Sequence, residues 1–174
     1  MFHSQSIRCW KLLEVLMHTP EMIENAENVA RAIFAPAMID RAGNVSVAAF
    51  SLRHNEGYFS VARMSVAEWM DDIKSIPETT GRKIDGYCKM NVGEIRNQDI
   101  VVREDKISLD VIEKATPSNR SHAGITISLC AKQLKGDKTL VLKPLEKGMV
   151  ASIIMAKVQS RLIGLANKEY VRFQ

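Results

Sequence analysis

The sequence predicts an α+β fold, a mainly antiparallel sheet with helices at both chain ends and one inserted helix. Apolar residues recur at spacings of three and four near both ends, as on one face of a helix. Between them, short runs rich in β-branched and aromatic residues alternate with turn-forming residues, which is typical of strands. We expect a single domain over residues 1–174, because no repeat or long linker divides the chain.

The two terminal helices are predicted from apolar spacing alone. The first covers residues 4–17. The last covers residues 144–167 and begins at Pro144, since the first turn of a helix tolerates proline.

The inserted helix follows a predicted hairpin. Residues 45–53 and 58–64 are two strand-like runs joined by four turn-forming residues. Ser65 and Glu68 then form a capping-box pattern, which predicts a helix over residues 66–76 that ends before the next proline. The other predicted strands are residues 29–34, 87–92, 100–104, 107–112 and 122–129.

Several classes of protein are excluded by what the sequence lacks. No run reaches the roughly 20 apolar residues that a membrane helix needs, and no secretory signal opens the chain. The three cysteines are scattered, which favours free thiols in a cytoplasmic protein. The four histidines are scattered too, and the glycine-rich phosphate-binding motifs are missing, so we predict no cofactor and no metal site.

The charge is distributed unevenly along the chain. Residues 1–113 contain 13 Lys and Arg against 17 Asp and Glu, a net charge of −4, whereas residues 114–174 contain 11 against 3, a net charge of +8. Such an excess attracts phosphates and acidic surfaces, so nucleic acid or an acidic protein is the predicted partner. The alternative is a solvated face, because no aromatic residues for base stacking lie among the lysines. The binding candidates are Lys132, Lys135, Lys138, Lys143 and Lys147.

His122 is a candidate catalytic residue. It stands among small residues in the run 118–124, and histidine titrates near neutral pH, so it can serve as a general acid or base. Arg120 in the same run is a candidate for binding an anionic group. The alternative is a structural histidine that bonds a backbone carbonyl. Phosphodiesterases with paired histidine motifs need a second such site, which the sequence does not show.

Arg31 and Ser60 are the other catalytic candidates. With an acidic residue, Glu94 or Glu113, they resemble in chain order the layout of ADP-ribosyltransferase clefts. In those clefts an arginine holds the dinucleotide phosphates and a glutamate orients the ribose. The alternative is an arginine that pairs with a carboxylate at a sheet edge.

Four short motifs stand out in the middle of the chain. They are Arg31-Ala32-Ile33, Gly43-Asn44-Val45-Ser46 leading to Ala49-Phe50, Phe59-Ser60-Val61-x-Arg63 and Ser121-His122-Ala123-x-Ile125. Together, over about residues 29–127, they resemble a pattern found in short, functionally uncharacterised bacterial proteins. The resemblance implies an intracellular bacterial protein and directs attention to Arg31, Ser60 and His122, but it brings no known activity.

Three functions are therefore compatible with the sequence. The first is a non-catalytic accessory or interaction module whose basic C-terminal region contacts nucleic acid or an acidic protein. The second is a small enzyme that acts on a nucleotide or phosphoester, with ADP-ribosyltransferase-like or phosphodiester chemistry. The third is an obligate subunit of a larger assembly, as a homo-oligomer or a hetero-complex.

Overall fold

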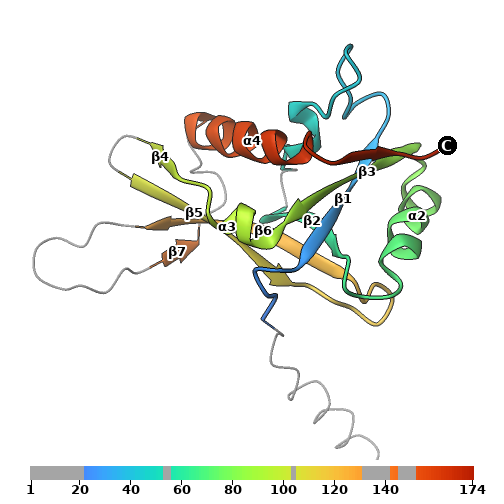
Figure 1. The fold of residues 1–174 in the computed structure, drawn as a ribbon, viewed down its shortest axis with the longest axis horizontal. Helices are drawn as coiled ribbons and strands as arrows, with labels where there is room; N and C mark the ends of the chain where they lie inside the picture. Colours follow the sequence, from blue (N-terminus) through green and yellow to red (C-terminus); the bar gives the residue numbers. More distant parts are fainter. Residues whose placement is uncertain (1–21, 53–55, 103–104, 131–141, 145–151) are drawn as a thin grey trace, which may run out of the picture.

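A curled antiparallel sheet organises the molecule (Figure 1). The structure, a computed structural model, describes residues 22–52, 56–102, 105–130, 142–144 and 152–174. Its strands are β1 (Asn28–Phe34), β2 (Tyr58–Arg63), β3 (Ile84–Asn91), β4 (Ile100–Val102), β5 (Asp105–Glu113), β6 (His122–Cys130), β7 (Leu142–Pro144) and β8 (Tyr170–Arg172). Its helices are the 3₁₀ turn η1 (Val47–Phe50), α2 (Trp69–Thr80), α3 (Val92–Arg96) and α4 (Ser152–Ala166). The α+β class and the antiparallel sheet are thus confirmed.

The order of the strands brings distant segments together. It is β4-β5-β6-β2-β1-β3-β8, with β7 beside β6, and every described pair is antiparallel. On β2 and β6, Ala62 lies opposite His122 and Ser60 opposite Gly124. Because opposite residues share a face and side chains alternate along a strand, Ser60 and His122 lie on the same face of the sheet.

The two faces of the sheet are covered by different helices. Val29 and Ile33 of β1 are fully buried in the main core, where Val158 and Leu162 of α4 are also fully buried. Burying a side chain of this kind contributes about 1.5–3 kcal/mol. The alternate β1 position, Ala30, belongs instead to a smaller cluster with α2 on the opposite face. Because successive side chains of a strand point to opposite faces, the large core lies between the sheet and α4, and the small cluster lies between the sheet and α2.

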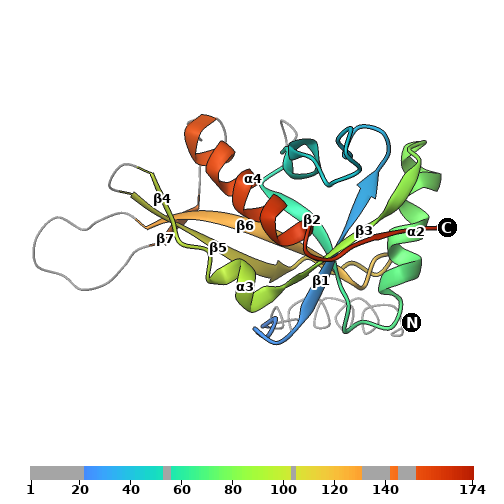
Figure 2. The same cartoon turned by 45° about the horizontal axis from the view of Figure 1, so that its top comes forward.

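Strands β1 and β2 run side by side for only a short distance. They pair at two positions, Val29 with Arg63 and Ala30 with Ala62, whereas β1 pairs with β3 at seven positions and β2 with β6 at five. Figure 2 shows the two strands spreading apart beyond this short ladder. We call this opening the β1–β2 split. It lies in the middle of the sheet, between strands that are well paired on their other sides.

Two predicted elements differ from the structure near this split. Residues 45–53 were expected as a hairpin strand but contain the η1 turn, and β2 pairs instead with the distant strands β6 and, over two positions, β1. The inserted helix is α2, which begins later than predicted, at Trp69, and continues through Pro77 to Thr80. Ser65 is not its N-cap, because the helix begins four residues later, and the Ser65 hydroxyl donates to Glu27 (2.8 Å).

The C-terminal end also departs from the prediction. Pro144 ends strand β7 and is not part of a helix, and the described helix, α4, begins at Ser152. Strand β8 then pairs with β3, so the chain ends on a strand. This close pairing needs a glycine, because a Cβ on Gly86 would lie 2.0 Å from the carbonyl oxygen of Val171. The N-terminal helix predicted over residues 4–17 lies outside the described residues.

Candidate functional site

A cavity of about 780 Å³ opens on the α2 side of the sheet, at the β1–β2 split. Strands β1 and β2 form its floor, and the side of α2 that carries Asp72, Ile73 and Ile76 forms one wall. Its remaining lining comes from the segment after β1, from η1, from the residues between α2 and β3, and from the turn before β6. It also contains all three predicted catalytic candidates, Arg31, Ser60 and His122.

The cavity exists because the floor side chains are small. The positions of β1 and β2 that face α2 include Ala30, Ala32, Ser60 and Ala62. Where α2 touches the floor, Ile73 packs against two of these alanines. Elsewhere the small side chains leave a space that larger residues would fill, since protein interiors are otherwise close-packed.

Arg31 bridges the β1–β2 split. Its Nε donates to the carbonyl oxygen of Ala49 in η1 (2.5 Å), and its Nη1 donates to the carbonyl oxygen of Ser60 in β2 (2.6 Å). The guanidinium also lies over the rings of Phe50 (5.3 Å) and Phe59 (5.8 Å). These contacts make Arg31 a brace between β1, β2 and η1, and they occupy donors that a phosphate contact would use.

Ser60 and His122 form a side-chain pair inside the cavity. The His122 Nε2 atom lies 3.4 Å from the Ser60 hydroxyl oxygen. The Tyr58 ring, 5.8 Å from the imidazole between ring centroids, packs onto Gly124 so closely that a Cβ there would lie 2.5 Å from it. The histidine is therefore confined between the tyrosine and the cavity.

The pKa of His122 lies below its ordinary value. Burial is the largest cause, because it disfavours the charged ring. A backbone hydrogen bond with Lys114 acts in the opposite direction, the Lys114 charge lowers the pKa further, and the Asp72 charge raises it. The net effect keeps the imidazole neutral at pH 7, as a general base requires.

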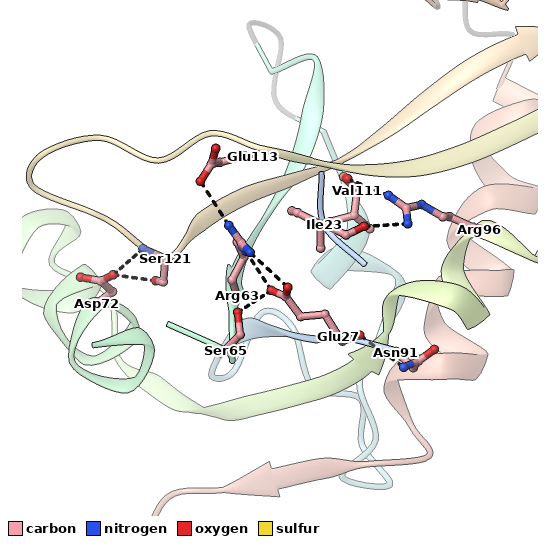
Figure 3. Close-up of polar contacts among 10 residues, drawn as sticks. All are labelled: Ile23, Glu27, Arg63, Ser65, Asp72, Asn91, Arg96, Val111, Glu113 and Ser121. Carbon is pink, nitrogen blue, oxygen red and sulfur yellow. Dashed lines mark hydrogen bonds and ion pairs between the residues drawn. The ribbon is translucent and has the colours of Figure 1, made fainter. Parts of the chain in front are cut away.

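Asp72 ties the helix wall to the strand that carries His122 (Figure 3). Its Oδ2 accepts hydrogen bonds from the Ser121 hydroxyl (2.6 Å) and the Ser121 backbone N–H (3.1 Å). Ser121 is fully buried. The contact fixes the start of β6 against α2, so it sets where His122 enters the cavity.

Two positively charged side chains lie between the end of α2 and the start of β3. Arg82 and Lys83 line this part of the cavity and are both exposed. The Arg82 guanidinium lies 5.8 Å from the centre of the Phe34 ring. The charged lining residues Arg31, Glu56, Asp72, Arg82 and Lys83 give the cavity a net charge of +1.

The other predicted site residues lie elsewhere. Arg120 is exposed and outside the cavity lining. The proposed acidic partners make other contacts: Glu113 pairs with Arg63 (3.2 Å) and Glu94 with Lys168 (3.2 Å). The backbone of Lys143 lies in β7, and its side chain is not described. Lys132, Lys135, Lys138 and Lys147 lie outside the described residues, so binding by the basic region stays a prediction.

Comparison with known proteins gives no family to the chain. No family model, curated protein or solved structure matches it. The site must therefore be interpreted from its own geometry.

Four cavity residues were not found by sequence reasoning: Asp72, Arg82, Lys83 and Asn119. Nothing in the sequence pairs Asp72 with Ser121, which lies 49 residues away. The adjacent cations Arg82 and Lys83 lie between the helix predicted over residues 66–76 and the strand predicted over residues 87–92, and they form no recognisable motif.

Three further findings limit the chemistry of the described part of the chain. Within it, no three His, Cys, Asp or Glu side chains come together as a metal site, and no helix is long and apolar enough to cross a membrane. Cys88 is buried, and burial raises the pKa of its thiol to about 11. That thiol is therefore unsuited to act as a nucleophile.

Proposed function

We propose that this protein is a small enzyme that binds a phosphate-bearing molecule of the nucleotide or phosphoester class and acts on it by general acid–base catalysis. The observation that carries the proposal is the Ser60–His122 pair inside a cavity of about 780 Å³. Small-molecule sites typically have volumes of roughly 300–1,000 Å³. Arg82 and Lys83 add the positive charge that a phosphate attracts.

The roles follow from the hydrogen-bonding capacity of each group. A neutral imidazole has one nitrogen that donates and one that accepts. The backbone hydrogen bond with Lys114 favours the protonated ring, so the ring is its donor. A general-base role requires the tautomer in which the other ring nitrogen carries the proton and Nε2, 3.4 Å from the Ser60 hydroxyl oxygen, is the acceptor. His122 then takes a proton from Ser60, or from a ligand hydroxyl or water in its place, as a general base.

The test is binding and turnover of a defined panel by the purified protein. Nucleoside mono-, di- and triphosphates and simple phosphomonoesters and diesters are titrated by calorimetry, and their turnover is followed by chromatography. We expect His122→Gln to lower turnover by about 10²–10⁴-fold, the usual contribution of a general base. Ser60→Ala should lower turnover while leaving thermal unfolding nearly unchanged, because Ser60 is exposed and its hydroxyl contacts the His122 ring at the cavity surface.

Arg120→Ala is the matched control. It removes an exposed charge two residues from His122 that does not line the cavity, so binding and turnover should stay at the wild-type level. If no member of the panel binds, or if His122→Gln retains full turnover, the proposed function is wrong.

The pH profile supplies an independent readout. Because the pKa of His122 is held below the ordinary histidine value of about 6.5, the acid limb of kcat/KM should lie below that pH. Activity should thus fall only as the solution becomes acidic enough to protonate the imidazole. In His122→Gln, any residual activity should lack this limb. An acid limb above pH 7 in the wild type would contradict the assignment.

A further inference from the structure

The cavity has two chemically different ends. One holds His122, Asn119 and Asp72, and we call it the inner end; the other holds Arg82 and Lys83, and we call it the cationic end. Ala30 and Phe34 are four positions apart in β1, about 13 Å at roughly 3.3 Å per residue. Asp72 and Thr80 are eight positions apart in helix α2, a similar length of about 12 Å.

The inner end has hydrogen-bonding capacity that the protein leaves unused. The Oδ1 atom of Asn119, a residue that lines the cavity, is buried and has no hydrogen-bond partner among the described residues. A buried polar atom of this kind is unfavourable unless something pairs with it. Asp72 contributes a carboxylate and His122 a neutral ring nitrogen, so acceptors dominate. This end suits a ligand group that carries N–H or O–H donors.

The cationic end suits one phosphate. Arg82 and Lys83 carry two positive charges, and a phosphate monoester carries about −1.5 to −2 at pH 7. The charges therefore match for a monophosphate and fall short for a longer phosphate chain.

The space between the two ends is lined by apolar side chains. Its floor is Ala30 and Ala32, and its α2 wall is Ile73 and Ile76. Ile73 packs against Ala30, and beside that contact the small floor side chains leave a space, which we call the slot, for a ring and its sugar. The slot offers apolar contact without specific hydrogen bonds.

We propose that the ligand is a nucleoside 5′-monophosphate that lies along this slot. Its phosphate contacts Arg82 and Lys83, and its base places donor groups against Asn119 and His122. This inference rests on the proposed function and adds the class and orientation of the ligand. It follows that Ser60 and His122 act on the nucleoside part of the molecule and not at phosphorus.

Calorimetry with three kinds of probe tests the orientation. The probes are the four ribonucleoside monophosphates, the four matching nucleosides and ribose 5-phosphate. For the Arg82→Ala/Lys83→Ala double variant, we expect about tenfold or greater loss of affinity for the bound monophosphate and for ribose 5-phosphate, since charged hydrogen bonds are worth 1.5–3 kcal/mol. Binding of the nucleoside should change less than about twofold.

Asn119→Ala gives the complementary pattern. It should weaken the monophosphate and its nucleoside by about threefold to tenfold, as loss of one neutral hydrogen bond predicts, and leave ribose 5-phosphate unchanged. Arg82 and Lys83 are exposed, so the double variant should fold normally, and thermal unfolding checks all variants.

The two proposals fail in different ways. If the Arg82→Ala/Lys83→Ala variant weakens nucleosides and spares ribose 5-phosphate, or if Asn119→Ala does the reverse, the orientation is wrong while the proposed function stands. If diphosphates or simple phosphoesters bind and monophosphates do not, the ligand class is wrong. If no phosphate compound binds the wild-type protein, the proposed function fails as well.

Discussion

Replacing Arg63 by alanine should lower the free energy of unfolding by about 3–5 kcal/mol, the usual cost of removing one member of a buried ion pair. Arg63 is 7% exposed. Its Nε and Nη2 contact both oxygens of Glu27 (2.8 and 3.2 Å), and its Nη1 contacts Glu113 (3.2 Å) (Figure 3). Without Arg63, two carboxylates remain in a poorly hydrated site with no cation from this position. Urea unfolding measures the loss.

Two further variants make this prediction specific. Lys89→Ala breaks the Lys89–Glu169 pair (2.6 Å), which is partly exposed, and should cost less than about 1 kcal/mol. The double variant Arg63→Met/Glu27→Gln should recover part of the lost stability, because it removes the Glu27 charge together with the arginine that neutralises it. If Arg63→Ala lowers the free energy of unfolding by less than about 1 kcal/mol, the prediction is wrong, and the two carboxylates are readily hydrated without Arg63.

The same cluster predicts a pH signature. Burial alone would raise the pKa of Glu27, but the hydrogen bonds from Arg63 and Ser65 and the Arg63 charge outweigh it and lower the pKa. A lowered folded-state pKa stabilises the fold fully above the unfolded-state pKa, and this contribution is lost as the pH falls through the folded-state value. The acid-side loss of stability should therefore be smaller in Arg63→Ala than in the wild type.

Replacing Arg31 by alanine should cost roughly 2–3 kcal/mol, because two backbone carbonyls lose their donor and two aromatic rings lose a cation. Arg31→Lys should recover little of this, since an ammonium group cannot reproduce the planar fork that reaches Ala49 and Ser60 together. Urea unfolding and ligand titration are both measured, because loss of the brace should widen the β1–β2 split and weaken binding.

Arg41→Ala serves as the control for Arg31. Arg41 is an exposed arginine in a turn, and its removal should change stability by less than about 0.5 kcal/mol. If Arg31→Ala matches this control in stability, Arg31 is not a brace. A loss of ligand affinity without any loss of stability would instead assign Arg31 a direct contact with the ligand.

The strands were the most predictable part of the fold. Residues 122–129 alternate, and β6 covers nearly the same range, because its inward side chains Ala123, Ile125 and Ile127 belong to the main core. The error at residues 45–53 has a different origin. That segment has strand composition, but which edges of β2 remain free depends on pairing with strands far along the chain. Local sequence does not contain that information.

The candidate site was predictable only as separate residues. Ser60 and His122 were chosen for their chemistry, and the pairing of β2 with β6 brings them together across 62 residues. The sequence did offer one unused signal for the cavity. In β1, Ala30 and Ala32 put small side chains at successive positions of one face, where a packed sheet usually carries larger residues.

The β1–β2 split places main-chain polar groups, and not only side chains, at the site. Beyond Ala30 and Ala62, the facing edges of β1 and β2 leave their ladder, and the carbonyl oxygen of Ser60 takes its proton donor from Arg31. Main-chain polar groups are the same for every amino acid except proline, so other substitutions along these edges change the shape of the opening but not its peptide dipoles. Proteins with a related site would therefore be found more readily by comparing backbone shape at a parted strand pair than by comparing residue motifs.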